Sequence, residues 1–115
     1  MILPWPPTVN TYYTVVRGRK ILSKKGRLYG PLVALAVADE PKGREGPLLV
    51  KIVAHPPDRR KRDLDNLLKP VLDGLQKAGM YADDSQIDRL EITRGDIIKG
   101  GRLDLWIAEY AREKM

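Results

Sequence analysis

The 115-residue sequence contains no cysteine and only one histidine. Without cysteine it can form neither a disulfide framework nor a thiolate metal site, which favours an intracellular protein. The longest apolar run, PLVALAVA, is too short to span a bilayer, and MILPWPP is too short and proline-rich for a signal peptide. No internal repeat, low-complexity segment or long linker divides the chain, so we expect one domain over residues 1–115. A lone histidine gives no chelate, and we interpret His55 as structural.

Basic residues are in excess. The chain has 21 Lys and Arg residues and 15 Asp and Glu residues, which gives a net charge of +6. Hydrophobic residues make up 43% and charged residues 31% of the chain, a composition typical of globular proteins rather than disordered ones. A surplus of positive charge favours an anionic partner, with nucleic acid as the first expectation and a membrane surface as the second.

Hydrophobic periodicity predicts four strands and two helices. The order β-α-β-α-β-β predicts a mixed α+β fold with one mixed four-stranded sheet and both helices on one face. The expected strands are 2–5, 48–55, 87–93 and 102–109, and the expected helices are 24–39 and 65–78.

Smaller signals refine this pattern. Residues 8–23 are predicted to form a polar and aromatic loop with a small ribbon, and Ser23 to cap the first helix. Gly30-Pro31 should kink that helix or delay its start, and Pro70 predicts that the second helix starts later than Asp65 or is bent. The link 94–101 is predicted to be a hairpin.

Aspartates flank the second predicted helix. Asp63 and Asp65 precede it at a spacing that points both side chains the same way in an extended chain, and the pair Asp83-Asp84 follows its end. Close carboxylates repel unless a cation lies between them, and Mg²⁺ takes such oxygen ligands together with water and phosphate oxygens. Lys69, one helical turn beyond Asp65, could offset negative charge on a phosphate under attack.

Structural roles also fit these residues. Asp63 or Asp65 could simply cap the helix, and Asp83-Asp84 could form a turn, so the spacing alone leaves both interpretations open. Two other carboxylate motifs fit less well. An EF-hand loop needs more oxygen ligands, whereas DLDNLLKP continues into leucines, and a phosphatase DxD nucleophile should directly follow an apolar strand.

The basic residues gather in groups that are candidate DNA contacts, because cations neutralise phosphates and release counterions. A charge run is usually a solvated face, but one of these groups adjoins the aspartates. Three polar and aromatic residues near the N-terminus could contact bases or sugars, or could pack within their loop. The candidate DNA-binding residues are Arg59, Arg60, Lys61, Arg62, Lys24, Lys25, Arg27, Lys99 and Arg102, with Asn10, Tyr12 and Tyr13. Lys20 belongs to the same basic group as Lys24, Lys25 and Arg27.

The stretch PDRRKRDLDNLLKPVLDGLQKAGMYADDSQID resembles the signature of RusA-type Holliday junction resolvases, the crossover junction endodeoxyribonucleases often carried by phages and prophages. The resemblance extends to PWPPTVNTYY, SKKGRLY and KGGRLDL, and so covers almost the whole chain. It implies a magnesium-dependent endonuclease, with Mn²⁺ as a substitute, that acts in DNA recombination and repair. It also implies a homodimer that resolves four-way junctions by paired symmetric nicks in the cytoplasm of a bacterium or phage host.

Carried over by position, the family's catalytic and metal-binding trio falls on Asp63, Asp65 and Asp84, and its catalytic lysine on Lys69. Asp83 would be an outer-shell helper. The Gly30-Pro31 pair and the residues before Gly100 depart from the family pattern. A DNA-binding or architectural protein without catalysis and a broader branched-DNA nuclease are the alternatives. The aliphatic run PLVALAVA is the candidate contact between two copies.

Overall fold

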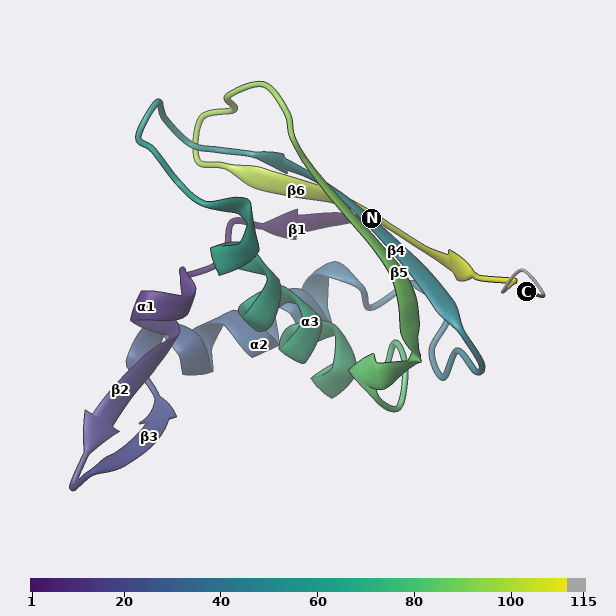
Figure 1. The fold of residues 1–115 in the computed structure, drawn as a ribbon, viewed down its shortest axis with the longest axis horizontal. Coiled ribbons are helices and arrows are strands. Elements are labelled where there is room, and N and C mark those ends of the chain that lie inside the picture. The colour runs from purple at the N-terminus through teal and green to yellow at the C-terminus, as the bar shows by residue number, and fades with distance from the viewer. Residues whose placement is uncertain (112–115) are drawn as a thin grey trace.

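Strands from both ends and from the middle of the chain build one mixed sheet (Figure 1). The computed structural model describes residues 1–111. In this part the strand order is β1-β6-β4-β5, with β4 antiparallel to β6 and parallel to β5. The predicted four-stranded mixed sheet is confirmed. Its strands are β1 (Ile2–Pro4), β4 (Leu48–His55), β5 (Ile87–Arg94) and β6 (Arg102–Glu109).

Two helices, α2 (Lys24–Ala36) and α3 (Leu68–Lys77), cover one face of this sheet, as predicted (Figure 1). Strand geometry explains the burial, because alternate side chains of a strand point to opposite faces. In β4 the residues at 48, 50, 52 and 54 are buried under the helices, while those between them are not. Val33 of α2 and Leu75 of α3 are fully buried in the same cluster. None of the described helices is long and apolar enough to cross a membrane.

Helix α2 begins where its cap predicts. The Ser23 side chain accepts a hydrogen bond from the Gly26 N–H at 3.0 Å, and the helix then runs from Lys24 without interruption across Pro31. Gly30-Pro31 therefore does not delay the helix start, and that part of the prediction is wrong. Pro31 lies inside the helix and removes one backbone donor from it. Gly26 lies so close to the Tyr12 carbonyl that a side chain there would collide with it.

The predicted small ribbon is also present, between α1 (Val9–Tyr12) and α2. It pairs β2 (Tyr13–Val16) with β3 (Arg19–Leu22) as a second, two-stranded sheet. The turn between the strands has positive φ at both central residues, Arg17 and Gly18. That backbone suits the tight turn of a hairpin.

The chain enters α3 through a 3₁₀ turn, η1 (Leu64–Leu67), so the α-helix starts at Leu68 and not at residue 65. Pro70 explains this shift, because it has no N–H to donate to a carbonyl four residues earlier. The later start is one of the two outcomes that the proline predicts. Gly79, with φ +82°, ends the helix, and a second 3₁₀ turn, η2 (Asp84–Gln86), leads into β5.

The link between β5 and β6 is not a hairpin, which corrects the prediction for residues 94–101. The two strands lie on opposite sides of β4, so the link passes the end of β4. His55, at that end, holds the link: its Nδ1 lies 2.8 Å from the Asp96 carbonyl and its Nε2 lies 3.1 Å from the Asp104 carboxylate. These contacts agree with the structural role expected of His55.

Candidate active site

The segment from β4 to α3 carries the first two candidate carboxylates. Asp63 is in an extended conformation at the N-terminal end of η1, and Asp65 lies in its first turn. Both are exposed, whereas Arg62, Leu64 and Asn66 around them are half-buried, so the two aspartates share the solvent-facing side. The predicted common direction assumed an extended chain at both positions, whereas Asp65 lies in a 3₁₀ turn, so that direction stays a prediction.

Neither of these carboxylates has a structural partner. Asp63 makes no side-chain capping bond, and the residue that precedes α3 is Leu67, so the capping alternative is not what the structure shows. In residues 1–111 the side chains of Asp63 and Asp65 have no hydrogen-bond or ion-pair partner. Two free, exposed carboxylates are available to a ligand.

The third candidate carboxylate, Asp84, follows α3 in the chain and lies beside that helix. The Asp84 N–H donates to Gln76 Oε1 of α3 at 3.0 Å, which fixes η2 against the helix. Its neighbour Asp83 has a structural role, because its carboxylate accepts the Ser85 N–H at 2.8 Å and closes a capping box with Gln86. The hydrogen bonds from Ser85 lower the pKa of Asp83. The turn alternative is thus correct for Asp83, and its outer-shell role stays a prediction.

Lys69 is held by a residue that the sequence analysis missed. Its Nζ lies 3.1 Å from Asp73 Oδ1, one turn along α3, and Tyr12 donates its hydroxyl to Asp73 Oδ2, also at 3.1 Å. The hydrogen bond with Asp73 is the main cause that raises the pKa of Lys69, and the nearby Tyr13 and Asp84 raise it further. Lys69 is therefore kept as an ammonium and is within electrostatic reach of Asp84.

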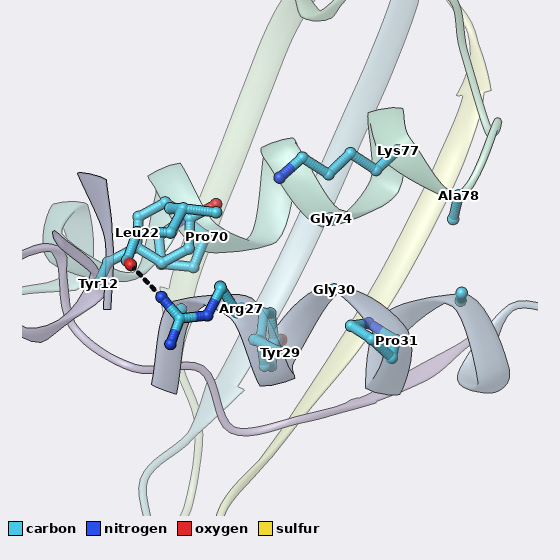
Figure 2. A pocket seen from close by; sticks show the side chains of 12 residues that line it. Tyr12, Leu22, Arg27, Tyr29, Gly30, Pro31, Pro70, Gly74, Lys77 and Ala78 are labelled. Carbon is cyan, nitrogen blue, oxygen red and sulfur yellow. Dashed lines mark hydrogen bonds between the residues drawn. The ribbon is translucent and has the colours of Figure 1, made fainter. Parts of the chain in front are cut away.

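Tyr12 connects the pair Lys69 and Asp73 to the protein interior. It is only 3% exposed, and burial together with Asp73 raises its pKa. Little of Tyr12 is therefore left for the predicted contact with DNA. Its ring also lines a pocket of about 350 Å³ between α2 and α3, which Arg27 and Lys77 border. Figure 2 shows these lining side chains. The Arg27 guanidinium donates to the Leu22 carbonyl at 2.9 Å.

A basic hollow of about 400 Å³ adjoins Asp63. Five cations and this one carboxylate line it, so a negatively charged backbone placed there would lie beside the aspartate. Arg94 is a cation that the sequence analysis missed; it donates to the Arg62 carbonyl at 2.8 Å. The lining residues are Arg59, Arg60, Lys61, Arg62, Asp63 and Arg94.

Arg62 differs from its neighbours in the run. Its Nη1 lies 2.7 Å from Asp58 Oδ1, and only 16% of its side chain is exposed. Hydrogen bonding from Arg62 lowers the pKa of Asp58 to about 2. The guanidinium carbon is also 5.8 Å from the centre of the Trp5 ring. Arg62 is thus a half-buried part of the wall of the hollow, while Arg59, Arg60 and Lys61 are exposed to solvent.

The remaining candidate DNA contacts fall in two other regions. Lys24, Lys25 and Arg27 are exposed at the start of α2, and Asn10 is exposed on α1. Tyr13 is half-buried at the base of the ribbon.

The last two candidates lie at the β5–β6 link. Lys99 is exposed, but Arg102 is half-buried and its Nε lies 3.0 Å from Asp104 Oδ1. Arg102 is therefore already engaged with a carboxylate of its own strand.

The three predicted metal ligands do not form a ready-made cage in one chain. In residues 1–111 no three His, Cys, Asp or Glu side chains lie close enough together to hold a metal ion. Mg²⁺ needs no such cage, since it is commonly held by one or two carboxylates together with water and substrate phosphate. The free pair Asp63 and Asp65 has the right donor chemistry for this kind of site.

Comparison with known proteins identifies the family of this chain. A family model described as "Endodeoxyribonuclease RusA" matches residues 4–107. The crossover junction endodeoxyribonuclease RusA of Escherichia coli strain K12 is 42% identical over 113 residues, covering 96% of this chain and 94% of the relative. The protein of the same name from enterobacteria phage 82 matches with the same identity and coverage. This chain is therefore a member of the RusA endodeoxyribonuclease family.

Proposed function

We propose that this protein is an endodeoxyribonuclease that cuts crossover DNA junctions, the four-way intermediates of recombination and repair. The observation that carries the proposal is the pair of exposed carboxylates Asp63 and Asp65, which have no partner among residues 1–111 and lie beside a hollow lined by cations. Free carboxylates next to a binding surface for phosphates have no evident structural use. Membership of the RusA family, whose named relatives are crossover junction endodeoxyribonucleases, supports the same function.

The site residues divide into those that would bind DNA and those that would take part in the reaction. Arg59, Arg60 and Lys61 would neutralise the phosphates of a DNA arm and draw the backbone towards Asp63. The Lys69 ammonium would lie against the phosphate under attack and offset its developing negative charge. Asp73 would hold that ammonium in place.

We propose Mg²⁺ as the cofactor, with Mn²⁺ as a substitute, held by Asp63, Asp65 and Asp84 in the presence of substrate. When bound, such a cation would polarise the phosphate and lower the pKa of a bound water. The carboxylate pair also repels the DNA backbone while no cation is present, which would make productive binding depend on the cation.

Paired symmetric nicking requires two active sites related by a two-fold axis. One chain has a single acidic cluster and no internal repeat, so we propose that the active form is a homodimer. Exposed leucines on α2 support the contact predicted for PLVALAVA. Leu32 and Leu35 of that run are 49% and 76% exposed, and Leu28, one turn before Leu32, is 56% exposed. They fall on one side of the helix at helical spacing. Such a protein would work where the DNA is, in the cytoplasm of a bacterial cell.

Incubation of the protein with a synthetic four-way junction tests the proposal, with a linear duplex of the same sequence as control. We expect cleavage of the junction in Mg²⁺, none in EDTA, and an intact duplex. Equal cutting of flaps and splayed arms would indicate a broader branched-DNA nuclease. Tight junction binding without cleavage in either Mg²⁺ or Mn²⁺ would indicate a DNA-binding protein without catalysis and would contradict the proposal.

A further inference from the structure

The net positive charge of the protein is confined to one short segment. Residues 1–38 contain six basic and no acidic residues, whereas residues 39–115 contain fifteen of each sign and so carry no net charge. The whole surplus of +6 therefore lies between Arg17 and Arg27. The basic run beside Asp63 is, by comparison, balanced by acidic residues elsewhere in its part of the chain.

Three of these six cations lie on the β2–β3 ribbon, which projects from the body of the molecule (Figure 1). Arg17 is in the turn, and Arg19 and Lys20 are in β3. All three are exposed, and residues 14–21 are exposed without exception. The ribbon thus presents its tip and both of its faces to solvent.

Each face of the ribbon combines aliphatic and basic side chains. The register places Val15 opposite Lys20 on one face and Val16 opposite Arg19 on the other. Val15 is 69% exposed and Val16 is 47% exposed. A free two-stranded ribbon of four-residue strands gains little stability from burial, so exposed valines on both faces are expected to have a partner.

The base of the ribbon is fixed next to the candidate active site. Ser23, directly after β3, donates an N–H to the Tyr12 carbonyl at 2.9 Å and caps α2. Tyr12, directly before β2, bonds to Asp73, and the following Tyr13 contributes to the raised pKa of Lys69. The ribbon therefore leaves the body beside the lysine that would act on the phosphate.

We propose that the β2–β3 ribbon enters the major groove of the duplex arm next to the phosphate that is cut. A two-stranded ribbon is an element that the major groove admits, and its strands would carry aliphatic groups towards the base edges. Arg17, Arg19 and Lys20 would contact the phosphates on the walls of the groove. Duplex DNA suits this segment better than a second copy of the chain, because two such ribbons, each with three cations and no acidic residue, would repel.

The proposal rests on the proposed function, since it assigns the ribbon to the same DNA substrate. It also goes beyond the predicted contacts, because it adds Arg17 and Arg19 and assigns the ribbon as a whole to one groove of the DNA. The site at Asp63 would hold the backbone near the cut, and the ribbon would hold the arm that leads to it. Binding and cleavage can therefore be tested separately.

The test compares two double variants that remove the same amount of charge. Arg17→Gln/Arg19→Gln removes two cations from the ribbon, and Lys51→Gln/Arg89→Gln removes two exposed cations from β4 and β5. Binding to a junction and to a linear duplex is measured by fluorescence anisotropy over a range of salt concentrations, without divalent metal. Thermal unfolding shows that each variant is folded.

For the ribbon variant we expect the log–log salt slope on both DNAs to fall by about 1.8, or about 0.9 for each phosphate that the variant no longer neutralises. The control variant should keep the wild-type slope. Equal slopes in the two variants would show that only net charge matters and would overturn the proposal. A change from dimer to monomer in the ribbon variant, measured by light scattering, would also overturn it by assigning the ribbon to the interface between copies.

The same experiment distinguishes failure of the ribbon proposal from failure of the proposed function. A lower slope in the ribbon variant supports the ribbon proposal even if the wild-type protein cuts no junction, and only the proposed function would then fail. If junctions are cut but the ribbon variant binds like the control, the ribbon proposal alone is overturned.

Discussion

At the scale of single residues, the two carboxylates Asp63 and Asp65 and the lysine Lys69 differ in how far neighbouring side chains hold them in place. Asp63 and Asp65 have no partner in the described part of the chain, so their replacement should cost little stability. Lys69 depends on Asp73, which in turn depends on Tyr12. The first pair can thus be tested by direct replacement, and the lysine through the residues that hold it.

We expect Asp65→Asn and Asp84→Asn to abolish junction cleavage while junction binding survives. The carboxylates would supply metal affinity and repel DNA, whereas the arginines and lysines would supply the binding. The check is the cleavage rate at saturating Mg²⁺ beside an anisotropy measurement of affinity. A wild-type rate in either variant would contradict the catalytic assignment, and loss of binding by a folded variant would show that the aspartates organise the DNA surface.

Tyr12→Phe tests the support of Lys69, and Tyr29→Phe is its matched control. Both hydroxyls donate from buried rings, one to Asp73 at 3.1 Å and the other to the Pro4 carbonyl at 2.8 Å. Removal of either hydroxyl should cost about 1 kcal/mol of stability. Only Tyr12→Phe should slow cleavage, by roughly tenfold if positioning contributes about 1.4 kcal/mol, with junction affinity unchanged. Equal cleavage by the two variants would mean that Tyr12 is only structural.

At the scale of elements, local patterns were sufficient for the strands and helices but not for their pairing. A run of Val, Ile and Leu predicted β4, alternating aliphatic residues predicted β6, and Ser23 and Gly79 marked helix ends correctly. Gly100-Gly101 predicted a reversal between β5 and β6, but a turn does not tell which strand lies next to which. That depends on β4, which pairs with both.

The same limit applies to the site. Asp63 and Asp65 could be predicted because they are close in sequence and adjoin a basic run. Asp73 could not, because its role depends on Tyr12, which is 61 residues away along the chain. Arg94 was missed for the same reason, since it reaches the Arg62 carbonyl from a strand 32 residues later. Residues that act through tertiary contacts have no local signal.

The basic loop 59–61 gives a prediction at this scale. Replacement of Arg59, Arg60 and Lys61 by Ala should weaken binding to all DNA, whatever its sequence, and flatten the salt dependence. Each phosphate of a duplex arm that the loop no longer neutralises should lower the log–log slope by about 0.9. A titration across salt concentrations measures it, and an unchanged slope would show that the loop faces solvent and not DNA.

At the scale of the whole molecule, one face of α2 is exposed in the part of the chain that the structure describes. Leu28→Glu/Leu32→Glu should convert the expected homodimer into monomers, because charges would be buried at the apolar interface. Leu90→Glu/Ile97→Glu is the matched control, since Leu90 and Ile97 are 39% and 48% exposed but lie on β5 and on the β5–β6 link. Light scattering gives the mass of each protein. A dimeric α2 variant would place the interface elsewhere, and a monomeric wild type with full resolving activity would contradict the dimer itself.

Cleavage of a four-way junction with each of its four strands labelled in turn tests the central claim most directly. In Mg²⁺ we predict nicks at symmetric positions in two opposite strands, an intact linear duplex of the same sequence, and no product with Asp84→Asn. A folded wild-type protein that binds the junction but cuts no strand, or that cuts the duplex equally well, would contradict the assignment as a crossover junction endonuclease.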